Sequence, residues 1–398
     1  MNKSYIKTIA LALSTVTLAG ALIKFPQPSL EASIRGLNMW WEIVFPSLLP
    51  FYIISEILIS FGVVAFIGVL LEPLMRPLFK VPGVGGFVWA MGMASGYPSG
   101  AKLTARLRNE NQITKIEAER LVSFTNSSNP LFIFGAVSIG FFQNPKIGIV
   151  LAIAHYAGNF IVGLIMRFYG KEKKRDERKK TPSIKQALGE MHRTRIKEKR
   201  PFGRILGDAV SSSIETLLLI GGFIILFSVI NKLLYIMNIT DILASCFSFI
   251  LGLFHLPADF SIPLVAGLFE MTLGSQMTSG IHGVSLLHQA IITSFILAFS
   301  GLSVQAQAAS ILAQTDIRFA PFFFARIIHG FIASLITLLI WKPVYEGLTL
   351  QGRPSNAMPV VGTPSHDWYQ AISSAGPVLT IFFLALYVYI LYRKKVRM

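Results

Sequence analysis

A cluster of polar and helix-breaking residues interrupts an apolar stretch that would otherwise be expected to form a membrane-spanning helix. It lies within residues 121–142 and consists of Asn126, Ser127, Ser128, Asn129 and Pro130. Hydrocarbon cannot satisfy the hydrogen-bonding groups of such a cluster, so it must face protein or a watery cavity. Its side chains and freed carbonyls could bind a polar substrate or a cation, and hydrogen bonding between helices is the alternative.

A second break of the same kind lies in residues 291–312. Its polar and small residues are Ser300, Gly301, Ser303, Gln305 and Gln307. Two broken spans in corresponding places are typical of transporters that bind their substrate near the middle of the membrane. We therefore predict substrate contacts at Asn126, Ser127, Ser128 and Asn129 of the first cluster. In the second, we predict them at Ser300, Gly301, Ser303 and Gln305.

Two shorter apolar runs, 81–101 and 257–281, are cut by Gly, Pro and Ser and predict re-entrant hairpins. The small residues of the first hairpin permit a tight reversal and leave backbone N–H groups free at a helix start, where anions bind well. The alternative is a loop that only turns the chain. The predicted substrate contacts in this hairpin are Ser95, Gly96, Ser99 and Gly100.

Glu270 lies in the second hairpin, two residues before Thr272, in otherwise apolar surroundings. An ionisable group at this depth costs about 2.5–3.5 kcal/mol, and such residues commonly mark functional sites. We predict that Glu270 and Thr272 bind a coupling ion, either a proton or Na⁺.

Arg326 lies within the apolar run 319–341, about 10 Å along the predicted helix. Its guanidinium either reaches back to the cytoplasmic edge or recognises a carboxylate of an anionic substrate in a bidentate way. His155, Asn159 and His329 are candidates for coupling or gating. Ordinary buried hydrogen bonding is the alternative for the two histidines.

The composition places these residues in a membrane protein. The chain has 398 residues, of which 53% are hydrophobic and 14% charged, with a mean hydropathy of +0.59. Soluble domains contain about 25% charged residues. Runs of about 20 apolar residues predict an all-α polytopic protein with about eight transmembrane helices besides the two hairpins. These helices are expected at 8–24, 40–64, 118–142, 147–168, 209–231, 288–312, 319–341 and 374–392.

The net charge of +16 is unevenly distributed, with many basic residues in 167–204 and at the end of the chain. This is the positive-inside pattern of membrane proteins, and it does not favour nucleic-acid binding. It places the loop 169–205 and both termini in the cytoplasm. The loop could also touch anionic lipid. Cys246 is the only cysteine, so no intramolecular disulfide is expected.

Two halves of the sequence repeat one order of elements: a helix, an apolar stretch, a hairpin, a broken helix and a final helix. Residues such as Phe124 and Phe295 match at an offset of 171, and the charges predict opposite orientations, hence inverted-topology repeats. The predicted parts are an N-terminal transmembrane helix (1–30), a first repeat (38–168), a basic loop (169–205), a second repeat (209–341), an external loop (342–373), and a C-terminal transmembrane helix with a basic tail (374–398).

Signatures of catalysis are missing from the sequence, which has no Walker loop, no His/Cys group with metal spacing and no nucleophile elbow. We therefore expect neither an enzyme nor a bound cofactor. The predicted function is transport of a small anionic molecule across the bilayer by alternating access. A membrane scaffold that recruits partners through the loop 169–205 is the alternative, and the sequence leaves homo-oligomer formation open.

Two motifs carry a family resemblance: Met93-Ala94-Ser95-Gly96-Tyr97-Pro98-Ser99-Gly100-Ala101-Lys102 and Phe124-Thr125-Asn126-Ser127-Ser128-Asn129-Pro130-Leu131-Phe132-Ile133-Phe134-Gly135. With them the chain resembles the YlbJ (SpoVV) family of sporulation integral membrane proteins over nearly its whole length. Each half also resembles the nucleoside-recognition Gate domain, which is related in plan to concentrative nucleoside transporters. Their Asn/Ser-rich broken helices are matched well by the first break and loosely by the second.

The YlbJ resemblance implies a protein of endospore formers that is made in the mother cell and placed in the outer forespore membrane. It implies export of dipicolinic acid, a small aromatic dicarboxylate, towards the developing spore. Arg326 and the first hairpin would then contact its carboxylates. The Gate resemblance keeps a nucleoside or another small metabolite as the alternative substrate.

Overall fold

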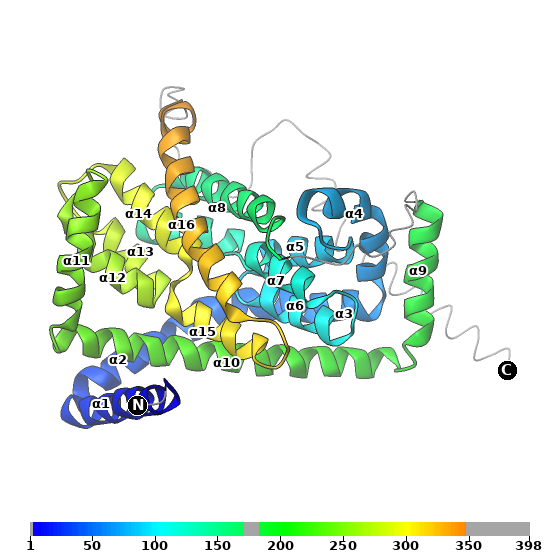
Figure 1. Ribbon diagram of the computed structural model, residues 1–398, viewed down its shortest axis with the longest axis horizontal. Helices are drawn as coiled ribbons and strands as arrows, with labels where there is room; N and C mark the ends of the chain where they lie inside the picture. The colour runs from blue at the N-terminus through cyan, green and yellow to red at the C-terminus, as the bar shows by residue number, and fades with distance from the viewer. Residues whose placement is uncertain (1–2, 171–182, 348–398) are drawn as a thin grey trace. The chain divides into compact units, whose positions relative to one another are not determined.

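The computed structural model describes residues 3–170 and 183–347, and within these ranges the chain forms helices joined by short turns (Figure 1). The helices of the first half are α1 (Lys3–Lys24), α2 (Pro26–Met39), η1 (Trp40–Val44), α3 (Phe45–Ser60), α4 (Val63–Phe79), α5 (Val84–Ser95), α6 (Ser99–Asn109), α7 (Lys115–Thr125), η2 (Phe132–Phe141) and α8 (Pro145–Met166). Those of the second half are α9 (Ile184–Lys197), α10 (Phe202–Ile236), α11 (Ile239–Leu253), η3 (Ala258–Phe260), α12 (Ser261–Phe269), α13 (Met271–Ser279), α14 (Leu286–Phe299), α15 (Gly301–Leu312), α16 (Phe319–Ile340) and η4 (Trp341–Glu346).

The all-helical membrane fold predicted from the sequence is confirmed. Four helical stretches among the described residues are long and apolar enough to cross a membrane, and the number rises to six if each of two bent helix pairs counts as one span. The pairs bend by 102° between α1 and α2 and by 82° between α3 and α4. Gly62, at the second bend, has a left-handed φ of 78°, which suits glycine because it lacks a Cβ atom. The predicted span 374–392 and the external loop beyond residue 347 lie outside the described residues.

Both predicted hairpins are present as pairs of short helices, α5 with α6 and α12 with α13. The arms of the second hairpin approach so closely that a Cβ atom on Gly274 would lie 2.2 Å from the Cα atom of Gly267. In the first hairpin, a Cβ atom on Gly100 would lie 2.3 Å from the carbonyl oxygen of Thr125, at the end of α7. Glycine therefore lets each hairpin pack tightly, one against itself and the other against the broken helix.

The two helix breaks occur where the polar clusters predict them. Helix α7 ends at Asn126, whose backbone is extended (φ −87°, ψ 95°), and helical structure resumes as the π-helical segment η2. Helix α14 ends at Ser300, which takes a left-handed φ of 69°, and α15 begins at Gly301.

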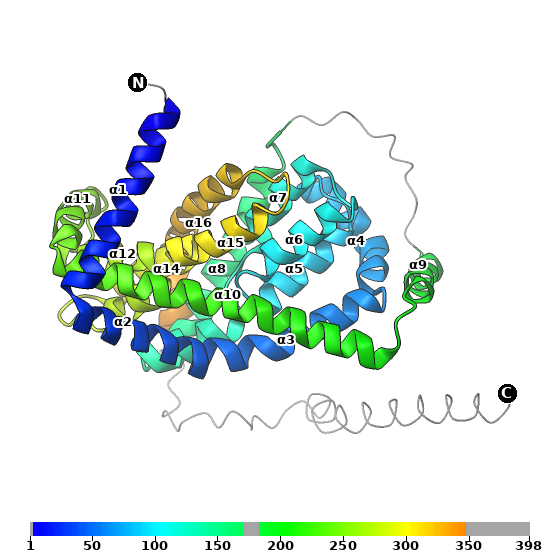
Figure 2. The same ribbon diagram turned by 90° about the horizontal axis from the view of Figure 1, so that it is seen from below.

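Equivalent helices of the two halves run antiparallel where they meet. Along α10, Ser228 donates a hydrogen bond to the carbonyl of Ala32 at 2.8 Å, whereas Phe202 stacks on Phe61 with 6.2 Å between ring centroids. The chain therefore runs along α10 in the direction opposite to α2 and α3, as Figure 2 also shows.

The last helices of the repeats follow the same rule. Asn144, at the start of α8, donates to the hydroxyl of Tyr345, beyond the end of α16, at 2.7 Å. Further along α8, the side chain of Asn159 accepts from Arg326, in the first half of α16, at 2.9 Å. Two pairs of equivalent antiparallel helices are the geometry expected of inverted-topology repeats.

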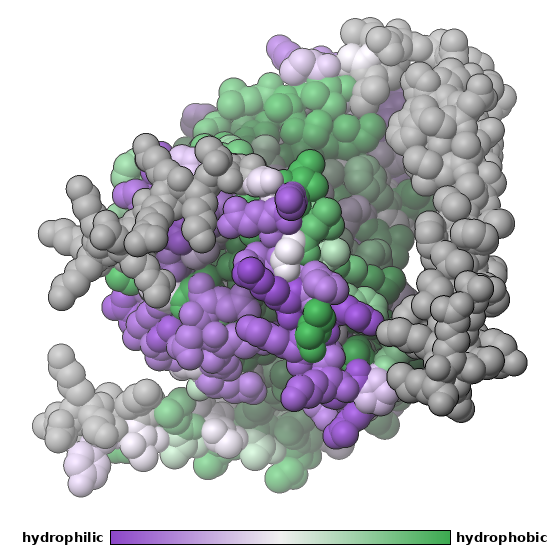
Figure 3. Space-filling view, turned by 90° about the vertical axis from the view of Figure 1, so that its right-hand side faces the viewer, coloured by the Kyte–Doolittle hydropathy of each residue, from purple (hydrophilic) through white to green (hydrophobic). Residues whose placement is uncertain are grey.

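Part of the predicted basic loop forms α9, which packs against α4. A Cβ atom on Gly62 would lie 2.7 Å from the carbonyl of Met191. Figure 3 views the molecule from the side that carries α9 in Figure 1 and shows hydrophilic side chains gathered over one area of this face. The domain boundaries given above, including those of this loop, stay predictions.

Candidate functional site

A cavity of about 540 Å³ lies where the tips of both hairpins meet both broken helices. Its walls include the side chains of α3 and α10 as well. The lining residues are Glu42, Val44, Pro46, Leu48, Gly96, Tyr97, Ser128, Asn129, Leu131, Phe132, Gly135, Ala136, Ile220, Ile224, Glu270, Met271, Thr272, Ser303, Val304 and Gln307. Residues more than 170 positions apart thus share one site, as the repeat pattern predicts.

Two hydroxyl groups in this lining have no hydrogen-bond partner among the described residues. They belong to Ser128, in the first break, and Ser303, in the second, and both side chains are buried. Buried polar atoms are normally hydrogen-bonded, so two unpaired hydroxyls on residues that line one cavity indicate a place for a polar ligand or for water. One hydroxyl comes from each repeat.

The charged groups of the lining are carboxylates. Glu42 and Glu270 face the cavity, and its described lining contains no lysine or arginine. The carboxylate of Glu270 also caps α13, because its two oxygens accept from the backbone N–H groups of Thr272 at 3.0 Å and Leu273 at 2.7 Å. The free backbone N–H groups at the start of α13 are therefore already bonded to a carboxylate of the same hairpin, which is the usual role of an N-cap residue.

The first break is held by hydrogen bonds to residues of α5, α8 and α16. Ser127 Oγ donates to the carbonyl of Gly92 at 3.3 Å, and Asn129 Nδ2 donates to the carbonyl of Ser95 at 3.4 Å, so both reach the first hairpin. The N–H group of Ser128 donates to Nε2 of His155, on α8, at 3.0 Å. The polar cluster therefore faces protein, and two of its residues, Ser128 and Asn129, also line the cavity.

Arg326, on α16, makes the remaining contacts with the first break. Its side chain is fully buried, so it does not reach back to an edge of the membrane. Nη1 donates to the carbonyl of Asn126 at 2.9 Å, and Nη2 donates to the carbonyl of Ser123 and to Oδ1 of Asn159, the latter at 2.9 Å. The guanidinium lies behind the break and outside the cavity lining, so its contact with a substrate carboxylate stays a prediction.

The second break is held by fewer contacts. Gln305 Nε2 donates to the carbonyl of Phe299 at 3.1 Å, which satisfies one of the last carbonyls of α14. The Ser300 side chain is fully buried, and its Oγ lies beside the Tyr97 side chain without a well-aligned hydrogen bond among the described residues. Gly301, with a φ of 68°, starts the next helix.

Two histidines join the repeats beside Arg326. The rings of His155 and His329 lie 4.9 Å apart between centroids. His329 Nε2 lies 2.8 Å from the carbonyl of His155 and so must carry the hydrogen of that bond. Its Nδ1 lies 3.1 Å from both Arg326 Nη1 and the carbonyl of Ala298, near the end of α14. One turn of α16 therefore contacts both broken helices.

The structure divides the predicted substrate residues into two groups. Those lining the cavity are Gly96, Ser128, Asn129 and Ser303, together with the predicted coupling residues Glu270 and Thr272. Those that lie behind the lining are Ser95, Ser99, Gly100, Asn126, Ser127, Ser300, Gly301, Gln305 and Arg326, with His155, Asn159 and His329.

Two polar lining residues, Tyr97 and Glu42, were not named as site residues by the sequence reasoning. Tyr97 lies within the first hairpin motif, whose signal was assigned to its small neighbours alone. Glu42 follows two tryptophans at the start of an apolar run. An acidic residue at that place is a signal that could have been used, because a charge in a span is costly.

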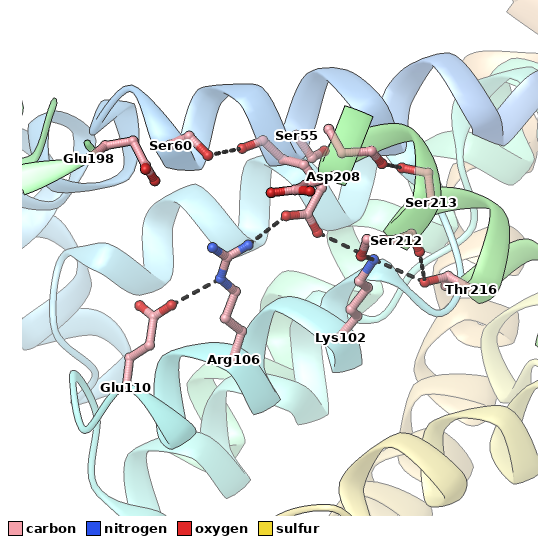
Figure 4. Close-up of polar contacts among 12 residues, drawn as sticks. Ser55, Ser60, Lys102, Arg106, Glu110, Glu198, Asp208, Ser212, Ser213 and Thr216 are labelled. Atoms are coloured by element: carbon pink, nitrogen blue, oxygen red, sulfur yellow. Dashed lines mark hydrogen bonds and ion pairs between the residues drawn. The ribbon is translucent and has the colours of Figure 1, made fainter. Parts of the chain in front are cut away.

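A separate polar network lies at the other end of α6 (Figure 4). Glu56 accepts from Arg106 at 2.6 Å and lies 3.3 Å from Lys102 Nζ, which also donates to Thr216 at 2.9 Å. Glu56 is thus neutralised by partners on the first hairpin. Near this network, the Arg200 guanidinium lowers the pKa of the Glu198 carboxyl to about 2 through a direct hydrogen bond.

This arrangement of two hairpins and two broken helices coincides with a known sequence family. The family model described as Gate, nucleoside recognition, matches residues 41–142 and 217–315. Each match covers one hairpin and one break, so the class that the fold and site define is a membrane protein with a duplicated Gate domain.

A curated relative narrows this class. The chain is 62% identical over 349 residues to the sporulation integral membrane protein YlbJ of Bacillus subtilis (strain 168), which covers 87% of this chain and 85% of the relative. The chain belongs to the YlbJ family of sporulation integral membrane proteins, within the Gate group.

Two solved structures of CNTnw are also similar to the chain. An outward-facing structure is 15% identical and covers 86% of this chain and 85% of that one, with a TM-score of 0.43. An inward-facing, substrate-bound structure is 13% identical and covers 84% and 86%, with a TM-score of 0.41.

Proposed function

We propose that the chain transports a small polar metabolite across the membrane and binds it in the cavity between the two repeats. The observation that carries this proposal is the pair of unpaired hydroxyls of Ser128 and Ser303, one at each helix break. Opposed repeats that share one central site can expose it to either side by rocking against each other. The duplicated Gate domain supports this proposal.

Our proposed substrate is dipicolinate, moved from the mother-cell cytoplasm across the outer forespore membrane. The membership in a sporulation membrane protein family supports this setting. Hydroxyl and amide groups of Ser128, Ser303 and Gln307 could donate to its carboxylates, while the remaining lining is largely apolar and suits an aromatic ring. N- and C-termini in the cytoplasm are part of the same proposal.

Charge balance adds a coupling ion to this proposal. A dicarboxylate in the cavity would lie near the carboxylates of Glu42 and Glu270, with no lysine or arginine in the described lining to offset the repulsion. Like charges in a site of low dielectric repel strongly. A proton on Glu270 would remove one of the negative charges, so we propose that a proton accompanies the substrate.

Purified protein in liposomes tests the transport proposal. We expect dipicolinate to enter these vesicles faster than it enters empty vesicles, and the Ser128→Ala, Ser303→Ala double variant to lose most of this flux. Equal entry into protein-containing and empty vesicles would contradict dipicolinate transport.

A nucleoside is the second candidate substrate, because the matched family model is described as nucleoside recognition. A competition panel separates the two candidates in the same vesicles. Inhibition of dipicolinate entry by other pyridine dicarboxylates and not by nucleosides supports the first, and uptake of a nucleoside with no dipicolinate flux supports the second.

A further inference from the structure

The contact between the two repeats contains a buried charge, the guanidinium of Arg326. The side chain of Arg326 has an exposed fraction of 0%, and no aspartate or glutamate in residues 3–170 and 183–347 forms an ion pair with it. A buried, unpaired guanidinium is costly unless its surroundings carry compensating negative potential. The groups that contact the guanidinium must therefore supply this negative potential.

Besides His329, whose Nδ1 lies 3.1 Å from Nη1, and the side chain of Tyr97, these groups are mainly oxygen atoms at the carboxyl end of a half-helix. The carbonyls of Ser123 and Asn126 accept from Arg326: Ser123 lies in the last turn of α7, and Asn126 is the extended residue that follows the helix, where the chain breaks. The last carbonyls of a helix lack intrahelical donors, and the helix dipole places negative partial charge there. Oδ1 of Asn159 adds a third oxygen, and the ring of Phe322 lies 5.6 Å from the guanidinium carbon.

This set of ligands is of the kind that holds a small cation. In transporters with broken helices, unwound carbonyls and the carboxyl ends of half-helices commonly coordinate a coupling Na⁺. In this chain the positive charge at these carbonyls belongs to Arg326, whose helix α16 is part of the second repeat. A metal ion at the same carbonyls would be repelled by the guanidinium and would find them already bonded.

We propose that the guanidinium of Arg326 is a built-in cation that occupies the carbonyl cluster of the first break in place of a coupling metal ion. Arg326 is then a positioning residue: it holds Ser123 and Asn126 so that Ser128 and Asn129 face the cavity. The proposal rests on the proposed transport function only for its consequence that transport needs no Na⁺. The occupied carbonyl cluster itself can be tested without any substrate.

Thermal unfolding of the purified full-length protein provides that test. We expect the same Tm for the wild type in NaCl, KCl and N-methyl-D-glucamine chloride at equal ionic strength. The Arg326→Ala variant should unfold at a lower temperature, and NaCl, KCl or millimolar guanidinium chloride should raise its Tm with increasing concentration, because a ligand bound only by the folded state stabilises it.

Arg193→Ala is the control. Arg193 lies on α9, pairs with Glu190 at 2.8 Å, and both side chains are exposed, at 73% and 40%, so its removal leaves no buried carboxylate. Its loss should not create a response to Na⁺ or to guanidinium. A response equal to that of Arg326→Ala would overturn the proposal, since the effect would then be general to lost arginines.

The wild-type measurement decides the proposal even if Arg326→Ala does not fold. A wild-type Tm that rises specifically with Na⁺ would show a metal ion bound beside the guanidinium and would overturn it. Replacement of Na⁺ in the liposome assay should leave the flux of the wild type unchanged. If no flux is seen under any condition, the transport function fails, and the stability measurements still report on the carbonyl cluster.

Discussion

The hydroxyl of Tyr97, at the tip of the first hairpin, donates a hydrogen bond to the backbone carbonyl of Leu297, on α14 of the second repeat, at 3.0 Å. Tyr97 also lines the cavity, and Leu297 lies three residues before the break at Ser300. This bond fastens the hairpin of one repeat to the broken helix of the other, beside the proposed substrate. A motion of one repeat against the other must break it or carry both partners along.

Replacing Tyr97 by Phe removes this bond and keeps the ring. We expect a loss of about 0.5–1.5 kcal/mol of stability, the usual contribution of one buried hydrogen bond, and an altered transport rate with little change in KM. Thermal unfolding and initial uptake rates measure the two effects. Tyr169→Phe is the control, because the Tyr169 hydroxyl bonds to Glu119, away from the cavity, at 2.8 Å. An identical change in transport rate for both variants would argue against a role of Tyr97 in gating.

The cavity hydroxyls of Ser128 and Ser303 should matter for binding more than for stability. Neither hydroxyl has a hydrogen-bond partner among the described residues, so replacing the serine by alanine breaks no internal hydrogen bond. A hydrogen bond to a charged ligand contributes about 1.5–3 kcal/mol, so each Ala variant should raise KM about tenfold or more at a nearly unchanged Tm. Ser213→Ala, whose hydroxyl bonds to the carbonyl of Ala209 at 2.7 Å, should leave KM unchanged.

Glu270 is expected to couple flux to protons. Glu270→Gln retains a carbonyl oxygen to accept from the N-terminus of α13 but can neither ionise nor bind a proton. We expect the variant to fold and its uptake to lose any stimulation by a pH gradient. Glu270→Ala also removes the cap, and its stability should fall by about 1 kcal/mol. Unchanged gradient dependence in the Gln variant would exclude Glu270 as the proton site.

Gly158 allows His329 to lie between the two repeats. A Cβ atom at position 158 would lie 2.9 Å from Cδ2 of His329, so Gly158→Ala must displace the ring and disturb its contacts with Arg326 and the carbonyl of His155. Overpacking of this kind costs about 1–3 kcal/mol, and we expect both Tm and flux to fall. Gly222→Ala, on an open part of α10 with no atom within 4 Å, should retain both.

The places of the hairpins and breaks could be predicted because they depend on local composition. A run such as Asn126–Pro130 cannot continue a helix in hydrocarbon, and Ser300 with Gly301 carries the same signal more weakly. The antiparallel relation of α8 and α16 followed from the charge distribution, since alternation across the membrane leaves few choices.

The partners of the buried polar groups could not be predicted in the same way. Arg326 binds the carbonyl of Asn126, 200 residues earlier in the chain, and backbone acceptors leave no pattern in the sequence. The choice between a substrate contact and a bond to a helix end therefore depends on the position of α7 against α16. For the same reason the roles of Tyr97 and Glu42 were missed, because what faces a cavity is decided by tertiary packing.

Helix α10 contains 35 residues, which at 1.5 Å per residue makes it about 52 Å long, whereas the hydrocarbon core of a bilayer measures about 30 Å. The helix must lean steeply or project beyond the lipid. Its early residues Ser212 and Thr216 bind Lys102, and its later residues Ile220 and Ile224 form part of the cavity wall. A displacement of α9, which precedes α10 in the chain, would be conveyed along this single continuous helix to the wall of the cavity.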